Sequence, residues 1–286
     1  MTTLKARLSG KITFLLLIPV LLCGPRTAFG GEADSPGPNI QLRGGFHNSL
    51  YRFEKEKKGH VAFIGGSITA MNGYRPMLRG FLQKRFPETK FTFTNAGISS
   101  TCSTSGAFRL QRDVLSRGPV DLFFIEYAVN DDQDAGHARR ECIRGMEGIL
   151  RQTRSHNPMA DIVITHFVNP GMLKTVGKGK EPVSSGAHED VAKHYGVSTI
   201  HLIREVDRLI AAKELTWKKF GGTHPGPHGN RLCADMIEKL LTTSWSMSAA
   251  DKAAKAAHAL PKKPLDPESY GKGRFIDPAT AKIKTG

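Results

Sequence analysis

Residues 61–69 read Val-Ala-Phe-Ile-Gly-Gly-Ser-Ile-Thr, and this stretch decides the expected fold. Four apolar residues that end in two glycines predict a buried strand that turns sharply at its carboxyl end. In an open α/β sheet, ligands bind at that end of the strands. Ser67 follows directly, and it is either a nucleophile displayed on the turn or the cap of a helix that begins near Ile68.

Apolar segments of strand length alternate with segments of helical pattern along the chain. The expected strands are residues 61–65, 90–94, 121–127, 161–167 and 197–201, and the expected helices are residues 76–85, 106–116, 134–156, 184–194, 204–213 and 227–243. The strands show little polar alternation, which indicates a parallel sheet covered on both faces. We therefore expect an α/β fold, a doubly wound three-layer sandwich around a five-stranded parallel sheet.

The two ends of the chain differ in composition from this central region. Residues 1–30 hold a basic start, an apolar run over 12–22 and a small-x-small site at 28–30, the layout of a secretory signal peptide. The run is too short for a permanent membrane span, so we expect export to the periplasm or the extracellular space. Residues 31–57 are predicted to be a loose lead-in, residues 58–245 the folded domain, and residues 246–286 a basic Ala/Lys/Pro-rich tail or linker.

The charge and the cysteines restrict the partners that the chain can have. The formal net charge is +15, and residues 1–30 contribute four basic residues and no acidic ones. Such a field favours anionic partners, but no zinc-finger spacing, RNP-type string or basic-region heptad is present, so we expect no nucleic acid. Cys102, Cys142 and Cys233 lack metal-ligand spacing, and their odd number excludes a disulfide scaffold.

Polar residues that could take part in catalysis follow three of the predicted strands. Ser67 follows the first strand, Asn95-Ala96-Gly97 follows the second, and Asn130-Asp131 follows the third. His224 precedes the last helix, in Thr-His-Pro. Because the carboxyl ends of parallel strands meet at one edge of the sheet, these residues are expected to share a pocket.

The order and flanks of these residues resemble those of the SGNH hydrolases, a branch of the GDSL esterase/lipase group, over residues 58–243. The resemblance implies a flavodoxin-like sheet and a serine esterase mechanism. It makes Ser67 the nucleophile and His224 the base, the latter in a His-Pro-x-x-x-Gly block. It also makes the Gly97 N–H and the Asn130 side-chain amide donors of an oxyanion hole, to which the Ser67 N–H would add a third.

The sequence departs from that family pattern at two positions. The aspartate that usually stands three residues before the histidine is replaced by Gly221, and the glycine of the third block is replaced by Ala128. A Ser–His dyad could therefore operate alone, or another carboxylate could orient His224. The candidates are Glu126, Asp131, Asp132, Glu205 and Asp207. His166 lies at the end of the fourth strand and either lines the pocket or is a buried histidine.

These expectations combine into an exported serine esterase that removes a small acyl group, acetyl above all, from a carbohydrate. The mechanism needs no metal and no organic cofactor. Two alternatives stay open on the sequence alone. One is a lysophospholipase-like hydrolase of lipid acyl esters, and the other is a non-catalytic carbohydrate-binding protein on a degenerate hydrolase fold, which the bare Gly221 would fit.

Overall fold

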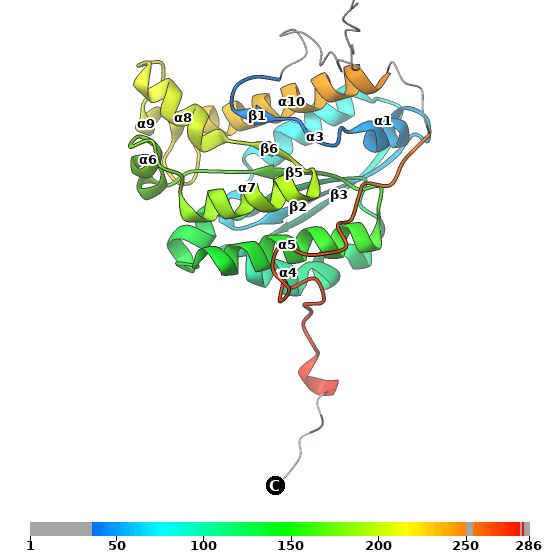
Figure 1. Ribbon diagram of the computed structural model, residues 1–286. Coiled ribbons are helices and arrows are strands. Elements are labelled where there is room, and N and C mark those ends of the chain that lie inside the picture. Colours follow the sequence, from blue (N-terminus) through cyan, green and yellow to red (C-terminus); the bar gives the residue numbers. More distant parts are fainter. Residues whose placement is uncertain (1–35, 250–253, 281, 283–286) are drawn as a thin grey trace, which may run out of the picture. The chain divides into compact units, whose positions relative to one another are not determined.

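The computed structural model describes residues 36–249, 254–280 and 282, all within one compact unit that comprises residues 34–286. The predicted signal peptide lies outside these residues. A six-stranded sheet forms the centre, in the order β1-β6-β5-β4-β2-β3 (Figure 1). The strands are β1 (Ile40–Gln41), β2 (Lys58–Gly65), β3 (Lys90–Gly97), β4 (Leu122–Glu126), β5 (Asp161–Thr165) and β6 (Ser198–Ile200). No helix in the described part of the chain has the length and apolarity needed to cross a membrane.

The five predicted strands are present and pair in parallel, which confirms the expected α/β fold. The helices are α1 (His47–Glu54), α2 (Ser67–Ala70), α3 (Tyr74–Arg85), α4 (Ser103–Asp113), α5 (Arg139–His156), α6 (Pro170–Val176), α7 (Val183–Tyr195), α8 (Leu202–Ala211), α9 (Trp217–Phe220) and α10 (Pro227–Ala249). Short 3₁₀ turns cover Leu115–Arg117 and Pro278–Thr280, and one π-helical turn covers Asn130–Asp134.

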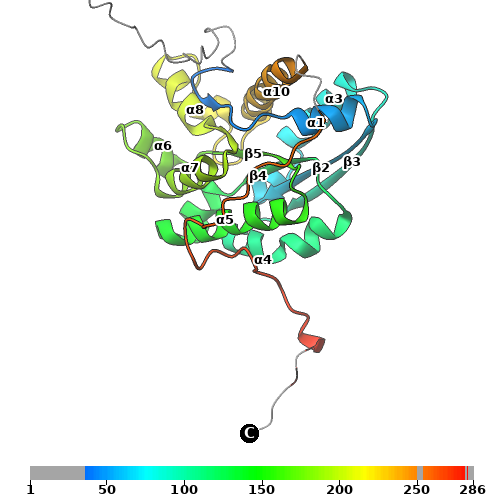
Figure 2. The same cartoon turned by 45° about the vertical axis from the view of Figure 1, so that its right-hand side comes forward.

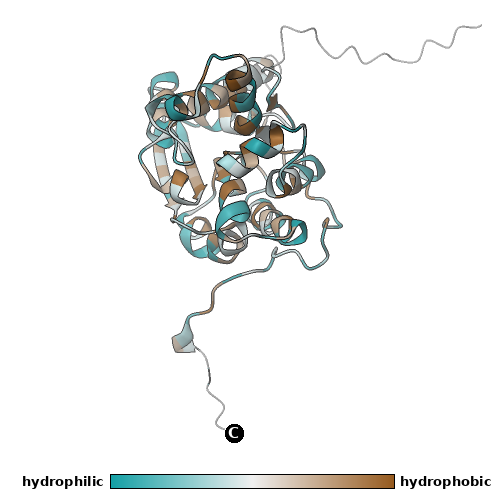
Figure 3. Cartoon of the chain, turned by 90° about the vertical axis from the view of Figure 1, so that its left-hand side faces the viewer, coloured by the Kyte–Doolittle hydropathy of each residue, from teal (hydrophilic) through white to brown (hydrophobic). Residues whose placement is uncertain are grey.

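Two apolar clusters, one on each face, hold the sheet between its helices. In β2, Val61 and Phe63 join the cluster formed with α1, α3, α8 and α10, whereas Ala62 and Ile64 join the cluster formed with α4, α5 and α7. Alternate residues of a strand point to opposite faces, so a strand that is apolar throughout is buried on both. The helices carry hydrophilic and hydrophobic residues side by side, as expected of elements that cover a core on one face (Figure 3).

The segment 31–57, predicted to be loose, contains two ordered elements in its described part. β1 pairs antiparallel with β6 at the sheet edge, and α1 buries Leu50 and Phe53 in the first apolar cluster. The ring of Phe53 lies 4.9 Å from that of Phe91, centroid to centroid, at 69°. The sequence did not predict α1, because it follows a Gly/Pro-rich stretch and because the few apolar residues of this helix gain stability only by tertiary packing.

Residues 259–270 of the C-terminal segment pack along α5, although their composition predicts a tail or linker, whereas the turn at Pro278–Thr280 lies away from the helices (Figure 2). Buried Glu147 on α5 accepts hydrogen bonds from the backbone N–H groups of Leu265 (2.6 Å) and Asp266 (2.9 Å). Asp266 also pairs with Arg140 at 2.6 Å. Two backbone N–H groups, two carboxylates and one guanidinium make these contacts, so the segment needs few apolar residues of its own to be held in place.

Candidate active site

The turn that displays Ser67 depends on two glycines between β2 and α2. A Cβ on Gly65 would overlap with the carboxylate of Glu126, and a Cβ on Gly66 would overlap with the side-chain amide of Asn130. Neither glycine has a positive φ, so close approach of other side chains explains the pair. Ser67 is the first residue of α2, and its N–H therefore has no intrahelical acceptor.

Ser67 and His224 are brought together from positions 157 residues apart, with Oγ 2.7 Å from Nε2. His224 lies in the loop between α9 and α10, where Gly221 and Gly222 have φ of 105° and 89°. Ser67 is half-buried and His224 is exposed, so a substrate can reach both. The distance is within the reach that proton transfer from a hydroxyl to an imidazole requires.

The other ring nitrogen of His224 has no side-chain partner among the described residues, and the structure explains why an aspartate is missing from position 221. Gly221 has a left-handed conformation, and a Cβ there would overlap with the backbone N of Gly226. The carboxylates proposed as substitutes make no hydrogen bond to His224 within the described part of the chain. Their recorded partners are instead the Ser67 turn for Glu126, Ser103 and His188 for Asp131, Asn169 for Asp132, and Asn39 and Arg208 for Glu205.

Glu126, the last residue of β4, hydrogen-bonds the turn that displays Ser67. Its Oε1 accepts hydrogen bonds from the N–H of Gly66 (2.9 Å), the N–H of Thr69 (3.1 Å) and the hydroxyl of Thr69 (2.7 Å). Its Oε2 is buried without a hydrogen-bond partner. Burial raises the pKa of Glu126 to about 7, and the three hydrogen bonds oppose that rise. The sequence offered Glu126 only as an orienting acid, and its role in the turn becomes visible only in three dimensions.

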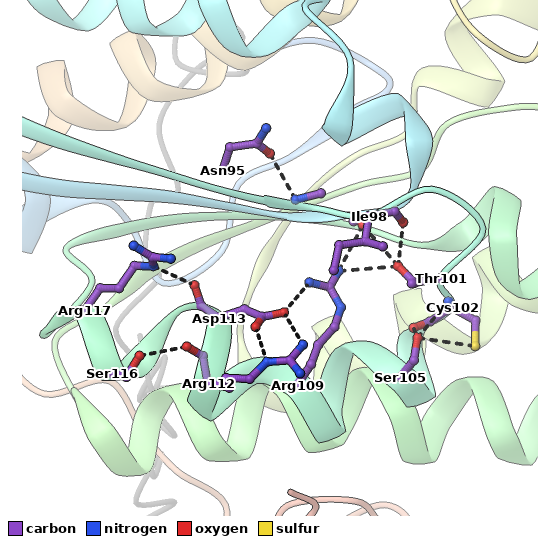
Figure 4. Close-up of polar contacts among 12 residues, drawn as sticks. Asn95, Ile98, Thr101, Cys102, Ser105, Arg109, Arg112, Asp113, Ser116 and Arg117 are labelled. Atoms are coloured by element: carbon purple, nitrogen blue, oxygen red, sulfur yellow. Dashed lines mark hydrogen bonds and ion pairs between the residues drawn. The ribbon is translucent and has the colours of Figure 1, made fainter. Parts of the chain in front are cut away.

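Both predicted oxyanion donors other than Ser67 are engaged with side-chain acceptors in this structure. The Gly97 N–H donates to Oδ1 of Asn95 at 3.0 Å (Figure 4), and the Asn130 amide donates to Asp134 at 2.5 Å. Asn130 is buried on the π-helical turn, and its Oδ1 has no partner. The amide keeps a second hydrogen for a ligand, whereas Gly97 would have to exchange its acceptor.

A buried arginine that the sequence did not single out ties α4 to the ends of β2 and β4. Arg109, on α4, is 2% exposed, and it donates to the carbonyl of Gly65 (3.1 Å) and the hydroxyl of Tyr127 (2.8 Å). Its guanidinium also pairs with Asp113 at 3.0 Å (Figure 4). Position 109 lies three residues after buried Gly106 on the inward face of α4, and that helical spacing was the available signal.

Asp131 and His166, predicted as pocket or orienting residues, are both fully buried. Asp131 accepts hydrogen bonds from the N–H and hydroxyl of Ser103 (2.7 and 2.6 Å) and lies 2.9 Å from Nε2 of His188. Burial alone would raise the pKa of Asp131, but His188 and Ser103 lower it below the ordinary value. Burial lowers the pKa of His166 to about 3. Asp131 therefore links the segment that follows β4 to α4, through Ser103, and to α7, through His188.

Comparisons with known proteins agree with this architecture. The model of the GDSL-like Lipase/Acylhydrolase family matches residues 63–232. No curated protein matches the chain in sequence. A two-domain esterase active on acetylated mannans, co-crystallised with mannopentaose, is similar in fold, with a TM-score of 0.65 and 23% identity. That match covers 82% of this chain and 61% of the esterase, so this chain spans about three fifths of its length.

Two shorter structures are similar over their whole length. An α/β hydrolase enzyme from the metagenome of Lake Arreo, Spain, has a TM-score of 0.55 and 18% identity, and the match covers 65% of this chain and 96% of that one. A catalytic mutant of an acetylxylan esterase from Geobacillus stearothermophilus has a TM-score of 0.51 and 18% identity, with 65% and 95% covered. At these identities the likeness concerns the fold.

Proposed function

Because this chain belongs to the GDSL-like lipase/acylhydrolase family and is a carboxylic ester hydrolase, we propose that it removes acetyl groups from a carbohydrate through Ser67 and His224. The observation that carries the proposal is the 2.7 Å contact between Ser67 Oγ and His224 Nε2. It lies just beyond β2, at the carboxyl edge of a parallel sheet, where such folds bind their ligands.

The first half of the reaction transfers the acyl group to the enzyme. His224 Nε2 takes the proton of Ser67 as Oγ forms a bond with the ester carbonyl carbon. The carbonyl oxygen becomes an anion, and we assign the Ser67 N–H and the Asn130 amide as the hydrogen-bond donors that stabilise it. The C–O bond to the sugar then breaks, and the departing sugar oxygen takes the proton from His224.

The second half releases the acid. A water molecule gives a proton to His224 and attacks the acyl carbon, and Ser67 Oγ leaves with the proton that His224 returns. Within the described part of the chain, no side chain hydrogen-bonds the second ring nitrogen of His224, so we assign a dyad. A triad that loses its acid keeps part of its activity, because the oxyanion hole and the base still act.

The acetylated carbohydrate and the export of the protein are proposals with separate support. Solved structures of similar fold are described as an esterase active on acetylated mannans and an acetylxylan esterase. Residues 1–30 carry the signal-peptide pattern, and polymeric substrates of that kind lie outside the cell. The net positive charge of the remaining chain suits polysaccharides that also carry acidic groups.

The test compares the wild type with Ser67→Ala and His224→Ala on 4-nitrophenyl acetate, 4-nitrophenyl octanoate and acetylated xylan. Each variant should lose at least about 10³-fold in kcat. Ser246→Ala and His156→Ala are matched controls, because both side chains are exposed on helices, and they should retain wild-type rates. Equal rates in all five proteins would refute the dyad. A rate that rises from acetyl to octanoyl esters would favour a lipid substrate, and no labelling by a fluorophosphonate would favour a binding protein.

A further inference from the structure

Three buried residues outside the proposed active site form what we call the His166–Glu189–His201 cluster. His166 directly follows β5, His201 directly follows β6, and Glu189 lies on α7. The exposed fraction is 0% for His166, 3% for His201 and 7% for Glu189. Because β5 and β6 are parallel neighbours, their carboxyl ends place the two imidazoles together, with ring centroids 4.7 Å apart and planes at 13°.

The possible ligand atoms of this cluster lie close to one another. Oε2 of Glu189 lies 3.1 Å from Nε2 of His201 and 3.6 Å from Nε2 of His166. Two donors bound tetrahedrally to Zn²⁺ at about 2.05 Å are about 3.3 Å apart, so the observed spacing brackets that of a metal site. The three ligand atoms lie within 4.8 Å of one another.

Hydrogen bonds within the protein leave two of the three ligand atoms without a partner. Oε2 of Glu189 and Nε2 of His166 have no hydrogen-bond partner, despite being 3.6 Å apart and fully enclosed. The 3.1 Å approach of His201 also lacks hydrogen-bond geometry toward that oxygen. The hydroxyl of Thr199 lies 3.3 Å from Nε2 of His201 and is the fourth polar neighbour. Buried polar atoms without partners are rare and costly, which points to a missing ligand.

An outer contact holds the carboxylate in the orientation that a metal needs. Arg43, in the segment after β1, donates through Nη2 to Oε1 of Glu189 at 2.6 Å. It also donates through Nη1 to Thr199 at 3.3 Å. With Oε1 occupied by the guanidinium, Oε2 is the oxygen that faces the two histidines, and ligating carboxylates are commonly fixed in this way.

A second group of metal-binding residue types, around Asp131, fits less well. Asp131, Cys142 and His188 also lie close together, but both oxygens of Asp131 already accept hydrogen bonds from Ser103 or His188. A cation there would have to replace those bonds. In the His166–Glu189–His201 cluster, Oε2 of Glu189 and Nε2 of His166 have no hydrogen-bond partner, and only the bond between the Thr199 hydroxyl and Nε2 of His201 would have to be exchanged.

We propose that the His166–Glu189–His201 cluster binds one divalent transition-metal ion of the Zn²⁺ type, which joins α7 to the ends of β5 and β6. Two imidazole nitrogens and one carboxylate oxygen form a donor set that Zn²⁺ accepts, and a water or the Thr199 hydroxyl completes four-coordination. The site is enclosed and shares no residue with the Ser67–His224 pair, so its role is structural. The ion enters during folding, because the closed core leaves the donors no exposure to solvent.

The test uses the untagged full-length protein, unfolded with a chelator and refolded with Zn²⁺ or Co²⁺. We expect about one ion per chain by elemental analysis after gel filtration. The Co²⁺ form should show the visible absorption of a four-coordinate nitrogen and oxygen site, and the refolded Zn²⁺ form should melt at a higher temperature than the metal-free form. Fewer than one ion per ten chains in the refolded wild type would overturn the proposal.

Substitutions of the proposed ligands test whether the ion binds at this cluster. His201→Asn and Glu189→Gln should reduce Co²⁺ affinity at least tenfold and remove the absorption band. His156→Asn, an exposed histidine on α5, should bind as the wild type does. Undiminished binding in His201→Asn would place the ion elsewhere and refute the assignment. If a variant fails to fold, the stoichiometry and the melting temperature of the wild type still decide.

Discussion

Replacing Glu126 by glutamine should change how the stability of the protein depends on pH. Burial raises the pKa of this carboxyl from 4.5 to about 7, so the folded protein holds a proton there between those values while the unfolded chain has released it. A state that binds more protons is favoured at low pH. The contribution of Glu126 to stability is therefore fully present below pH 4.5 and is lost as the pH rises through 7.

The size of the effect follows from the two pKa values. At about 1.36 kcal/mol for each pKa unit, ionising Glu126 in the folded protein costs about 3.4 kcal/mol more than in the unfolded chain. Between pH 5 and pH 8 the part of this cost that develops is about 2.5 kcal/mol, since the unfolded chain is already largely ionised at pH 5. Glutamine has no charge at either pH. The variant should therefore gain about 2.5 kcal/mol on the wild type over this interval.

The assay is urea unfolding at pH 5, 6, 7 and 8 at constant ionic strength, followed by circular dichroism. At pH 5 the variant should be less stable by about 1–2 kcal/mol, because its amide N–H₂ would occupy the place of Oε2, which has no hydrogen-bond partner. At pH 8 it should equal or exceed the wild type. Glu214→Gln, at an exposed position three residues after the end of α8, serves as the control and should run parallel to the wild type. A Glu126→Gln curve that also runs parallel, within about 0.5 kcal/mol, would refute the reasoning.

Three further perturbations test other parts of the structure. Gly221→Asp, which would restore the family's residue, should lower the unfolding free energy by about 2–4 kcal/mol without raising kcat, because the left-handed backbone has no room for a Cβ; a faster enzyme would contradict this. Gly66→Ala should push the amide of Asn130 aside and lower kcat by about 10²-fold at a stability cost of about 1–2 kcal/mol, and an unchanged kcat would exclude Asn130 as an oxyanion donor. Deleting residues 254–286 should cost about 2–4 kcal/mol in urea unfolding, since buried Glu147 loses two N–H donors, whereas deleting only residues 283–286 should cost nothing measurable.

The fold was predictable because its signal is local. Each parallel strand is apolar on both faces, and each helix repeats its apolar positions every three or four residues, so type and order can be read along the chain. The elements that were missed have weak local signals. β1 contributes two residues to the sheet edge, and α1 and the segment after residue 253 are held by contacts with distant residues.

The sequence by itself determined the five parallel strands and the identity of the paired residues Ser67 and His224, because their order and flanks are properties of the chain. Only the tertiary structure decided how their neighbours are used. Glu126 became the support of the nucleophile turn, and Gly221 proved unable to carry an aspartate in this backbone. His166, Glu189 and His201 are separated by 23 and 12 residues, so no spacing rule joins them. Burial and close approach depend on all packed elements together, and a linear pattern does not record them.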